Sequence, residues 1–377
     1  MSHQLVCCGD VTDLASWSNI PYFLLQAGKR QGLLSSGLVL RPERLRWQRR
    51  LWNLQQWLRT GRPGGFQYSQ WFLRSLWRQA QLPPLPATEP RRLLCHYPLL
   101  PPLPWPPQWR VSFYIDATTR QVLEDYGAGS RLAPRFQREL LRRERTAYGA
   151  AQAVITMSEW AAESVRCDYS IPAARVHVVP GGANLDEQAL AALPPAQLPP
   201  APSVQQPLRL GFLGKEWQRK GGPFVLALAE ALTQQGVPAV VRAIGPQPAE
   251  LPPSPQLQPL GFINKRTATE AFAQELRSWH FGTLFSSTEA FGISNRECLR
   301  LGVPVLARAI GGIPSTFSGE GCGQLFAQGV AVEEVVAWIR EQLSPYERYV
   351  AMRQQLAAHP LDFSWDASAQ HLCEILG

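Results

Sequence analysis

The sequence has few lysines and lacks the common metal-binding and redox motifs. Lys occurs at only four of 377 positions, so most of the 37 basic residues are Arg. The seven Cys are scattered, with neither a CxxC motif nor a Cys/His pair at zinc-ligand spacing, which excludes a zinc-finger or zinc-ribbon site. Scattered thiols of this kind are typical of reduced, packed cysteines, and they predict a cytoplasmic location.

Long apolar runs and a leader-like beginning are missing too. No apolar run approaches the ~20 residues of a membrane-spanning helix, and residues 1–10 lack basic residues before their short apolar stretch. We therefore expect neither a spanning helix nor a signal peptide. Hydrophobic residues make up 45% and charged residues 18% of the chain, which excludes a disordered protein. The length fits two domains, each with its own core.

Positive charge is concentrated in the first half. Residues 1–200 hold 23 Lys and Arg against 14 Asp and Glu, whereas residues 201–377 hold 14 against 15. The net charge of +8 therefore belongs to the first half. It predicts that this half faces an anionic substrate, a membrane surface or a nucleic acid.

Alternating strands and helices are predicted on both sides of a Pro-rich stretch, residues 193–207. After it, we predict strands at 208–213, 239–244, 281–286 and 303–307, and helices at 224–235, 268–279, 294–301 and 332–343. Before it, we predict strands at 4–8, 93–96, 111–115 and 154–157, and helices at 44–60, 72–81, 139–151 and 159–169. This alternation predicts βαβ units and parallel sheets, with ligands at the carboxyl ends of the strands.

A glycine-rich segment, residues 211–222, connects a predicted strand to a predicted helix. Glycines let the backbone approach a ligand closely, and the start of a helix offers free N–H groups. Two of the four lysines, Lys215 and Lys220, lie here. Since a compact ammonium group suits a diphosphate, the segment predicts a phosphate-binding loop. The alternative is a solvated loop that carries two lysines by chance.

Two carboxylates follow the predicted strand at 281–286. Glu289 is expected in the loop and Glu297 in the first turn of the next helix. Carboxylates beside free backbone N–H groups can grip sugar hydroxyls while the amides bind phosphate. Ser294 and Glu297 also fit a capping box, which would give Glu297 a role without a ligand. Glu289 has no such alternative and is the stronger candidate.

In this order, the two segments resemble the retaining glycosyltransferases of family 4, also called group 1. The family's Glu-x7-Glu signature is matched by Glu289 and Glu297, and its G-[RK]-x4-K-G loop by residues 214–221. Residues 158–160 (SEW), 178–184 (VVPGGAN), 301–307 (LGVPVLA) and the glycine pair 311–312 also look like the family. The resemblance covers residues 150–320.

The resemblance implies an α/β fold of the GT-B type, with two Rossmann-like domains facing across a cleft. The acceptor-side domain is expected at residues 1–192 and the linker at 193–207. The nucleotide-sugar domain is expected at 208–344, and C-terminal helices at 345–377 would pack back on the first domain. The activity implied is hexosyl transfer in carbohydrate biosynthesis, from a nucleotide sugar, without cofactor or metal ion.

The resemblance also implies roles for single residues. The lysines would hold the donor diphosphate, the loop amides would assist at sugar and phosphate, and Glu297 would hold the ribose hydroxyls. Glu289, as the catalytic residue, would contact the transferred sugar. The expected donor-binding residues are Gly214, Lys215, Lys220, Phe291, Gly292, Ile293 and Glu297.

The first half departs from the family at two places. Many members carry a His-Asp pair after an N-domain strand, but the matching stretch, residues 114–118 (YIDAT), has no His. The loop at residues 10–19 lacks the usual glycine pair. His96 and Asp116 each end a predicted strand and are candidates for the acceptor side, although each also has a structural interpretation.

Residues 41–92 hold eleven Arg and two Glu, with five Trp interleaved. Trp47 and Trp52 are predicted to share a helical face with Leu51 and Leu54. A basic amphipathic helix is typical of a membrane-surface element, so region 41–78 predicts peripheral membrane contact and a lipid-linked acceptor. The alternative is an ordinary domain helix with Arg on its wet face. No recognised nucleic-acid module accompanies the charge, so no nucleic-acid partner is expected.

Two other functions fit the same fold. A catalytically silent scaffold that binds a nucleotide sugar is suggested by the missing His and the altered first loop. A sugar epimerase or phosphorylase would turn over its substrate without an added acceptor. The acceptor itself, whether a glycan, a lipid-linked sugar or a small molecule, is left open by the sequence.

Overall fold

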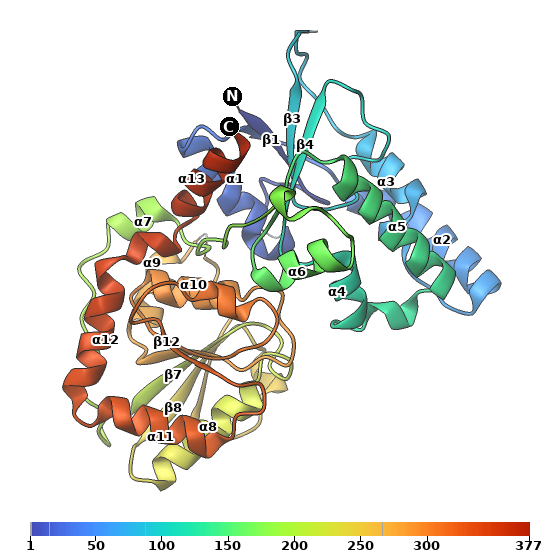
Figure 1. The fold of residues 1–377 in the computed structure, drawn as a ribbon. Coiled ribbons are helices and arrows are strands. Elements are labelled where there is room, and N and C mark those ends of the chain that lie inside the picture. Colours follow the sequence, from blue (N-terminus) through green and yellow to red (C-terminus); the bar gives the residue numbers. More distant parts are fainter. Residues whose placement is uncertain (1, 15, 87, 266) are drawn as a thin grey trace. The chain divides into compact units, whose positions relative to one another are not determined.

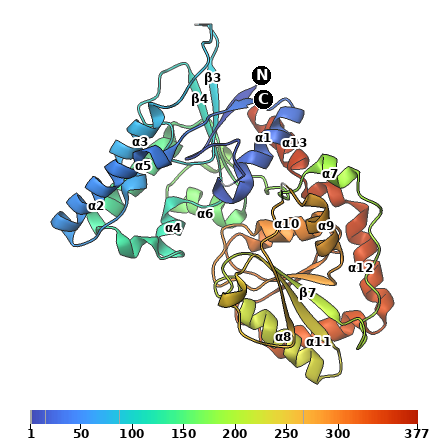
Figure 2. The same ribbon diagram turned by 180° about the vertical axis from the view of Figure 1, so that it is seen from behind.

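The chain folds into two compact units, each built on one six-stranded parallel sheet (Figures 1 and 2). The computed structural model describes residues 2–14, 16–86, 88–265 and 267–377. Unit 1 comprises Met1–Pro180 and Ser368–Gly377, and unit 2 comprises Gly181–Ala367. This architecture confirms the predicted α/β class with two domains.

Unit 1 has the strand order β2-β1-β3-β4-β5-β6. Its interior strands are apolar runs that are buried on both faces of the sheet, as parallel strands covered by helices must be. Helices α3, α5 and α6 pack their apolar sides into a core on one face. The strands are β1 His3–Val6, β2 Leu34–Gly37, β3 Arg91–Cys95, β4 Trp109–Ile115, β5 Val154–Thr156 and β6 Val176–Val178. The helices are α1 Ile20–Arg30, α2 Arg46–Thr60, α3 Gln70–Trp77, α4 Thr119–Glu124, α5 Pro134–Ala150 and α6 Glu159–Cys167.

Unit 2 has the strand order β12-β11-β10-β7-β8-β9, that of a doubly wound nucleotide-binding sheet. Helices α8 and α11 cover one face of this sheet, and α9 and α10 cover the other (Figures 1 and 2). The strands are β7 Leu208–Leu213, β8 Ala239–Ile244, β9 Leu257–Gly261, β10 Phe281–Leu284, β11 Val305–Arg308 and β12 Gly323–Phe326. The helices are α7 Glu187–Ala191, α8 Gly222–Gln234, α9 Thr269–Arg277, α10 Ile293–Arg300, α11 Val332–Leu343 and α12 Tyr346–Ala358, followed by α13 Trp365–Leu376.

Each sheet has a topological switch point, where the direction of winding reverses. In unit 2 it lies between β7 and β10, and in unit 1 between β1 and β3. In open α/β sheets, ligands bind at the switch point, outside the carboxyl ends of the strands. The loops that follow β7, β10, β1 and β3 are therefore the first places to look for a site.

The boundary between the units lies at Pro180 rather than at the Pro-rich segment 193–207. That segment is fastened to unit 2 through its carbonyl oxygens: Arg277 donates to Pro194, and the ring of His280 contacts Pro200. Proline has no N–H, so carbonyl oxygens are what such a segment offers for hydrogen bonding. Residues 193–207 thus lie along unit 2 instead of forming a free linker.

Only the end of the C-terminal segment groups with unit 1. Helix α12 belongs to unit 2, where Tyr349 donates to the carbonyl of His280 and Arg353 to that of Trp279. Ser368–Gly377 belongs to unit 1, where the Ser368 hydroxyl donates to the carbonyl of Pro180. The expectation that all of 345–377 packs on the first domain is therefore wrong for α12, whose aromatic and guanidinium side chains are buried in unit 2.

The predicted common face of Trp47 and Trp52 on α2 is also wrong. Five residues at 100° each place the two side chains 140° apart. Trp52 turns inward, donates its indole N–H to the carbonyl of Gly64 and packs against Phe66 and Phe136. Trp47 points outward and is 72% exposed.

None of the helices formed by the described residues combines the length and the hydropathy that crossing a bilayer requires.

Candidate functional site

The strongest candidate site lies at the switch point of unit 2. The loop after β7 (residues 214–221) and the loop after β10 (residues 285–292) leave neighbouring strands at the same edge of the sheet. The amide of Ser287 donates to the carbonyl of Arg219, and the Arg219 guanidinium donates to the carbonyl of Thr288 at 2.8 Å. These bonds join the two segments in which the sequence predicted a donor site.

Lys220 and Glu289 meet where these loops touch. The Lys220 Nζ lies 3.0 Å from Oε2 of Glu289, and the Arg219 guanidinium lies 3.3 Å from the same oxygen. The Glu289 side chain is only 12% exposed, so solvent screens this cluster less than it screens a surface pair. Arg219 also pairs with the carboxylate of Glu216, so the cluster holds two cations and two carboxylates.

At two positions of the first loop, a side chain larger than that of glycine would collide with neighbouring atoms. A Cβ on Gly214 would lie 2.3 Å from Cδ of Lys220, so the lysine stem crosses directly over this residue. Gly221 has a φ of +79°, and a Cβ there would lie 2.2 Å from the carbonyl oxygen of Phe285. Gly221 therefore sets the separation of the loops that carry Lys220 and Glu289, whereas Gly214 leaves room for the Lys220 side chain within its own loop.

Gly311 and Gly312 lie against the backbone carbonyl of Glu289. The amide of Gly312 donates to the carbonyl of Glu289 at 3.0 Å. A Cβ on Gly311 would lie 2.1 Å from that same oxygen, and Gly311 has a φ of +53°. The glycine pair noted in the sequence thus fixes the backbone of the candidate catalytic residue.

Lys215 does not join this cluster. Its side chain is exposed, and its ammonium group lies 5.5 Å from the ring centre of Phe262, an exposed residue after β9. The structure therefore brings together Lys220 and Glu289, but leaves Lys215 on the rim of the loop.

Glu297 is buried and paired with a lysine that sequence reasoning passed over. Its Oε1 accepts a hydrogen bond from Nζ of Lys265, in the loop after β9, and the residue is 1% exposed. Burial raises the pKa of the Glu297 carboxyl, while the ammonium groups of Lys265 and Lys220 act in the opposite direction. Its second oxygen, Oε2, has no hydrogen-bond partner in the described structure and is available to a ligand hydroxyl.

The capping box expected from Ser294 and Glu297 is not formed. Helix α10 begins at Ile293 with Gly292 as its N-cap at a φ of +98°, so Glu297 lies beyond the first turn. The Ser294 hydroxyl is buried, and no described residue forms a hydrogen bond with it. The capping interpretation of Glu297 is therefore wrong, because the Phe-Gly turn starts the helix two residues before the position a Ser294 cap requires.

Free backbone amides complete the site. In the parts of the chain described, no acceptor contacts the N–H groups of Phe291, Gly292 or Ile293 at the start of α10. The start of a helix carries partial positive charge and attracts anions. Together with Lys220 and Arg219, these amides form an arrangement suited to phosphate.

A second candidate site lies at the switch point of unit 1. His96 follows β3, Asp116 follows β4, and both line a pocket of about 300 Å³. Trp17, Tyr68 and Tyr97 supply aromatic walls. Such a pocket, apolar with a few polar groups, is the usual form of a small-molecule site.

The hydrogen bonding of His96 defines what the pocket can bind. Its Nδ1 lies 2.7 Å from the carbonyl oxygen of Tyr114, and since a carbonyl only accepts, Nδ1 carries the proton. In the tautomer with the proton on Nδ1, Nε2 is an acceptor, and it is buried without a partner among the described residues. Asp116, also without a hydrogen-bond partner among the described residues, adds a second acceptor. The pocket therefore offers acceptors to a ligand that donates hydrogen bonds.

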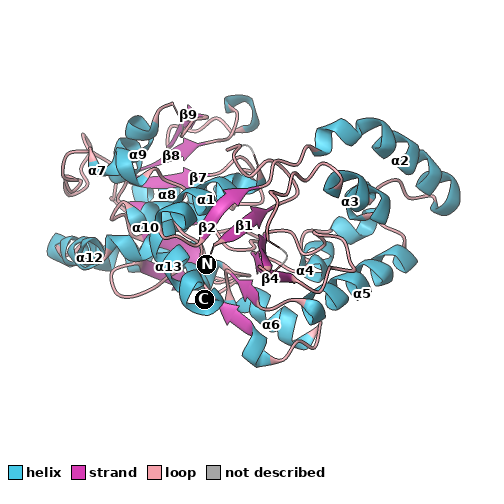
Figure 3. Cartoon of the chain, turned by 90° about the horizontal axis from the view of Figure 1, so that it is seen from above, coloured by secondary structure: helices cyan, strands magenta, loops and turns pink. Residues whose placement is uncertain are grey.

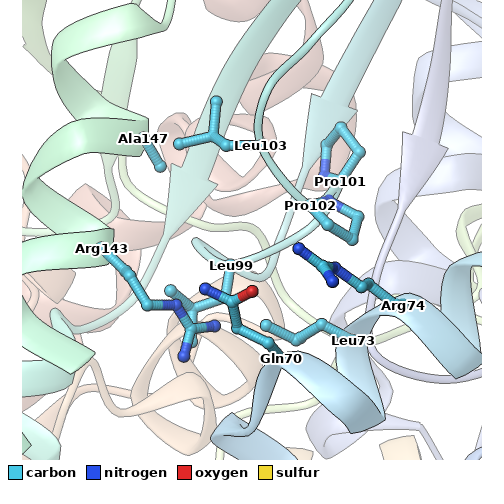
Figure 4. A pocket seen from close by; sticks show the side chains of 9 residues that line it. All are labelled: Gln70, Leu73, Arg74, Leu99, Pro101, Pro102, Leu103, Arg143 and Ala147. Atoms are coloured by element: carbon cyan, nitrogen blue, oxygen red, sulfur yellow. The ribbon is translucent and has the colours of Figure 1, made fainter. Parts of the chain in front are cut away.

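A smaller hollow in unit 1 is not a candidate for a sugar ring. It measures about 60 Å³, room for a few water molecules. Figure 4 shows Arg74 and Arg143 at its two sides. Arg143 donates to the carbonyl of Tyr68, a residue that lines the larger pocket. The Arg143 side chain therefore connects the small hollow to Tyr68, a residue of the His96 pocket.

Two residues of the candidate site, Arg219 and Lys265, are not predicted by the sequence analysis. Arg219 lies inside the predicted phosphate-binding loop, but arginine is abundant in this chain. Lys265 is one of only four lysines, so the scarcity that drew attention to Lys215 and Lys220 applied to it as well. Its partner is 32 residues away, and no local pattern connects the two.

Two glycosyltransferase family models match parts of this chain. The model of Glycosyltransferase Family 4 matches residues 34–187, and that of Glycosyl transferases group 1 matches residues 247–358. A curated relative, D-inositol 3-phosphate glycosyltransferase of Corynebacterium kroppenstedtii, is 28% identical over 106 residues. That match spans 28% of this chain and only 23% of the relative's length.

Solved structures share the fold over almost the whole chain. Sucrose-phosphate synthase from Thermosynechococcus elongatus has a TM-score of 0.60 at 15% identity, covering 99% of this chain and 98% of its own. WaaG, a glycosyltransferase involved in lipopolysaccharide biosynthesis, has a TM-score of 0.62 at 12% identity, covering 99% of both chains. Anabaena HepE in complex with UDP and glucose has a TM-score of 0.61 at 13% identity, also over 99% of both.

The family models match both units in the expected order, and the fold is shared along the chain. This chain therefore belongs to the family 4, group 1 glycosyltransferases, a family of transferase enzymes, and has their two-domain GT-B fold.

Proposed function

We propose that this chain transfers a hexose from a nucleoside diphosphate sugar to an acceptor, with retention of anomeric configuration. The observation that carries the proposal is the Lys220–Glu289 ion pair at the unit 2 switch point, beside the free amides of α10. HepE has also been solved with UDP-glucose. UDP-glucose is therefore the first donor to test.

The donor displaces part of the ion-pair cluster. Lys220 and Arg219 turn to the diphosphate, with Lys215 as an outer contact, and the α10 amides bind its oxygens. Glu289, freed from the two cations, accepts hydrogen bonds from hydroxyls of the transferred sugar. Glu297, fixed by Lys265, accepts from the ribose hydroxyls through its free oxygen.

Charge stabilisation supplies most of the rate enhancement. As the bond between the sugar carbon and the diphosphate oxygen breaks, negative charge grows on the leaving group, where Lys220, Arg219 and the helix start lie ready for it. The acceptor hydroxyl oxygen bonds to the same face of the oxocarbenium-like carbon while its proton passes to the departing diphosphate oxygen, which gives retention. No protein nucleophile is assigned.

We also propose that the reaction needs no metal ion, since cationic side chains and amides take the place of a bridging cation. The measurement is the transfer rate before and after treatment with EDTA. A loss of activity that added Mg²⁺ or Mn²⁺ restores contradicts this part of the proposal.

The acceptor binds in the His96 pocket of unit 1. A hydroxyl donates to Nε2 of His96 or to Asp116, and the aromatic side chains stack on the apolar face of a sugar or similar ring. The acceptor is thus proposed to be a hydroxylated molecule, either free or attached to a lipid.

A thermal-shift screen tests donor binding. UDP, GDP and ADP are each added with and without an attached hexose, because a ligand at 100 times its Kd stabilises the protein by about 2.7 kcal/mol. The expected result is a shift for one base. If no nucleotide shifts the unfolding temperature, the donor site is wrong.

Variants at Glu289 then separate transfer from binding. Glu289→Ala should abolish transfer and keep nucleotide binding. Glu216→Ala is the matched control, because Glu216 also pairs with Arg219 but is an exposed residue. Transfer unaffected by Glu289→Ala contradicts the assignment, whereas turnover of a nucleotide sugar without any acceptor points to an epimerase or hydrolase. Nucleotide binding without turnover points to a silent scaffold.

A further inference from the structure

Helix α2 presents an apolar stripe to the outside of unit 1. Trp47, Leu51, Leu54 and Leu58 are spaced by four, three and four residues, which places them on one face of the helix. They are 72%, 61%, 55% and 70% exposed. An α-helix of a globular domain normally turns such a stripe toward the core.

The stripe cannot turn inward, because the opposite face already holds the helix in place. Gln48, Trp52, Asn53 and Gln56 are half-buried and face the protein, and Trp52 is fixed by its bond to Gly64 and its packing on Phe66 and Phe136. No residue of α2 is buried. Figures 1 and 3 show α2 at the rim of unit 1, on the outer side of α3.

Exposed arginines flank the stripe. Residues 41–62 hold seven Arg and one Glu. Arg46, Arg49, Arg50 and Arg59 are exposed, and in the described structure none forms an ion pair. The guanidinium of Arg50 lies 4.8 Å from the ring centre of Trp47, so charge and apolar surface are adjacent.

We propose that α2 is a docking surface for an anionic lipid bilayer and lies along it, with the stripe Trp47-Leu51-Leu54-Leu58 among the acyl chains and the arginines at the headgroups. A helix that lies in the interface needs this combination of an apolar face and a basic polar rim. The proposal goes beyond the transfer reaction and does not depend on it.

The charge pattern favours a bilayer over a second copy of this chain. In a twofold dimer through α2, the flanking arginines would face those of the other copy, and like charges repel. The same arginines are attracted to phosphate headgroups, and tryptophan side chains prefer the boundary between headgroup and acyl chain.

Flotation with vesicles tests the proposal. The full chain is mixed with vesicles of phosphatidylglycerol and phosphatidylcholine at 1:1, or of phosphatidylcholine alone, at low and high salt. Wild type is expected to float with the anionic vesicles at least tenfold more than with the neutral ones, and salt should reduce that difference.

Two pairs of matched variants locate the surface. Leu51→Ser/Leu58→Ser should lower anionic-vesicle binding about tenfold, whereas Leu85→Ser/Leu361→Ser, at exposed leucines elsewhere, should leave it unchanged. Arg46→Gln/Arg50→Gln should also lower it about tenfold, and Arg340→Gln/Arg348→Gln removes the same charge from unit 2 as the control. All these positions are exposed, and circular dichroism checks that each variant is folded.

Three outcomes overturn the proposal. The first is wild type that fails to float with anionic vesicles at low salt. The second is an equal loss of vesicle binding in the α2 variants and in their controls. Binding would then depend on the net charge of the protein and not on α2. The third is self-association in sedimentation velocity that Leu51→Ser/Leu58→Ser abolishes without any vesicle binding, which assigns the stripe to a second copy. Nucleotide thermal shifts are measured in parallel, so failure here is distinct from failure of the donor site.

Discussion

The two units place opposite chemistry at equivalent positions of similar sheets. At the switch point of unit 2, lysine and arginine side chains meet two carboxylates, and contacts between charged groups hold the loops. At the switch point of unit 1, aromatic walls surround a histidine nitrogen and a carboxylate that are able to accept hydrogen bonds from a ligand. The contrast fits a donor that arrives with a charged diphosphate and an acceptor that arrives with hydroxyls. Similar sheets can therefore serve either ligand, because the loops and not the strands carry the chemistry.

The largest effect is expected from Lys265→Met in unit 2. It leaves the buried Glu297 without its cation, which costs 3–5 kcal/mol for a fully buried pair. Because Lys265 is partly exposed, we expect a loss of about 3 kcal/mol. Urea denaturation measures the loss, and hydrogen exchange at the amides of α10 should locate it. Unchanged exchange in α10 would show that Glu297 does not depend on this lysine.

Lys220→Met and Lys215→Met form a matched pair within one loop. Lys220 touches Glu289 and Lys215 does not, so we expect kcat/KM to fall about 100-fold for Lys220→Met, equivalent to about 2.7 kcal/mol. The fall for Lys215→Met should be about threefold. Initial rates at varied donor concentration test this order. A larger fall in kcat/KM for Lys215→Met than for Lys220→Met would contradict the proposal that the Lys220–Glu289 ion pair lies at the donor diphosphate.

Gly221→Ala tests the spacing of the donor loops. The substituted residue must keep a positive φ and avoid the Phe285 carbonyl, a strain of about 2 kcal/mol. We expect a lower unfolding midpoint and weaker nucleotide binding. Gly236→Ala is the control, because Gly236 also has a positive φ, but its Cβ would meet open space. Equal losses of stability and of nucleotide binding for Gly221→Ala and Gly236→Ala would mean that the positive φ alone causes them, and that contact with Phe285 does not.

His96→Phe tests the proposed acceptor pocket of unit 1. It keeps an aromatic ring and removes the acceptor nitrogen, so the KM for the acceptor should rise about tenfold, or about 1.4 kcal/mol. Nucleotide thermal shifts should not change. A change in donor binding with normal acceptor KM would break the assignment of the two units.

The smallest effect concerns a buried carboxyl in each unit. Glu144 of unit 1 accepts hydrogen bonds from Tyr148, Tyr169 and the amide of Thr119, and burial raises its pKa as it does that of Glu297. A raised pKa means that the folded state binds the proton more tightly than the unfolded state. Stability from this group therefore falls as pH rises from about 4.5 through the folded pKa. Glu144→Gln should flatten the pH dependence of the unfolding midpoint. If the midpoint of the variant changes with pH as much as that of wild type, Glu144 does not cause this dependence.

The sequence predicted the interior of both sheets and missed their edges. Strands β2, β6, β9 and β12 were not predicted, and they are the four outermost strands. Interior strands carry apolar runs that are buried on both faces, whereas β9 contains Pro259 and β12 has no fully buried residue. Edge strands lack the strong patterning on which prediction depends.

The sequence by itself determined the α/β class, the family and the loops that carry the candidate donor site, because these follow from local periodicity and from motifs of adjacent residues. Only the tertiary structure decided which charged groups meet. Lys220 finds Glu289 across 69 residues, Lys265 finds Glu297 across 32, and Lys215 finds neither. It also decided that Trp52 faces the protein and Trp47 the outside. Such pairings depend on where strand order brings distant loops together, and no local pattern records that.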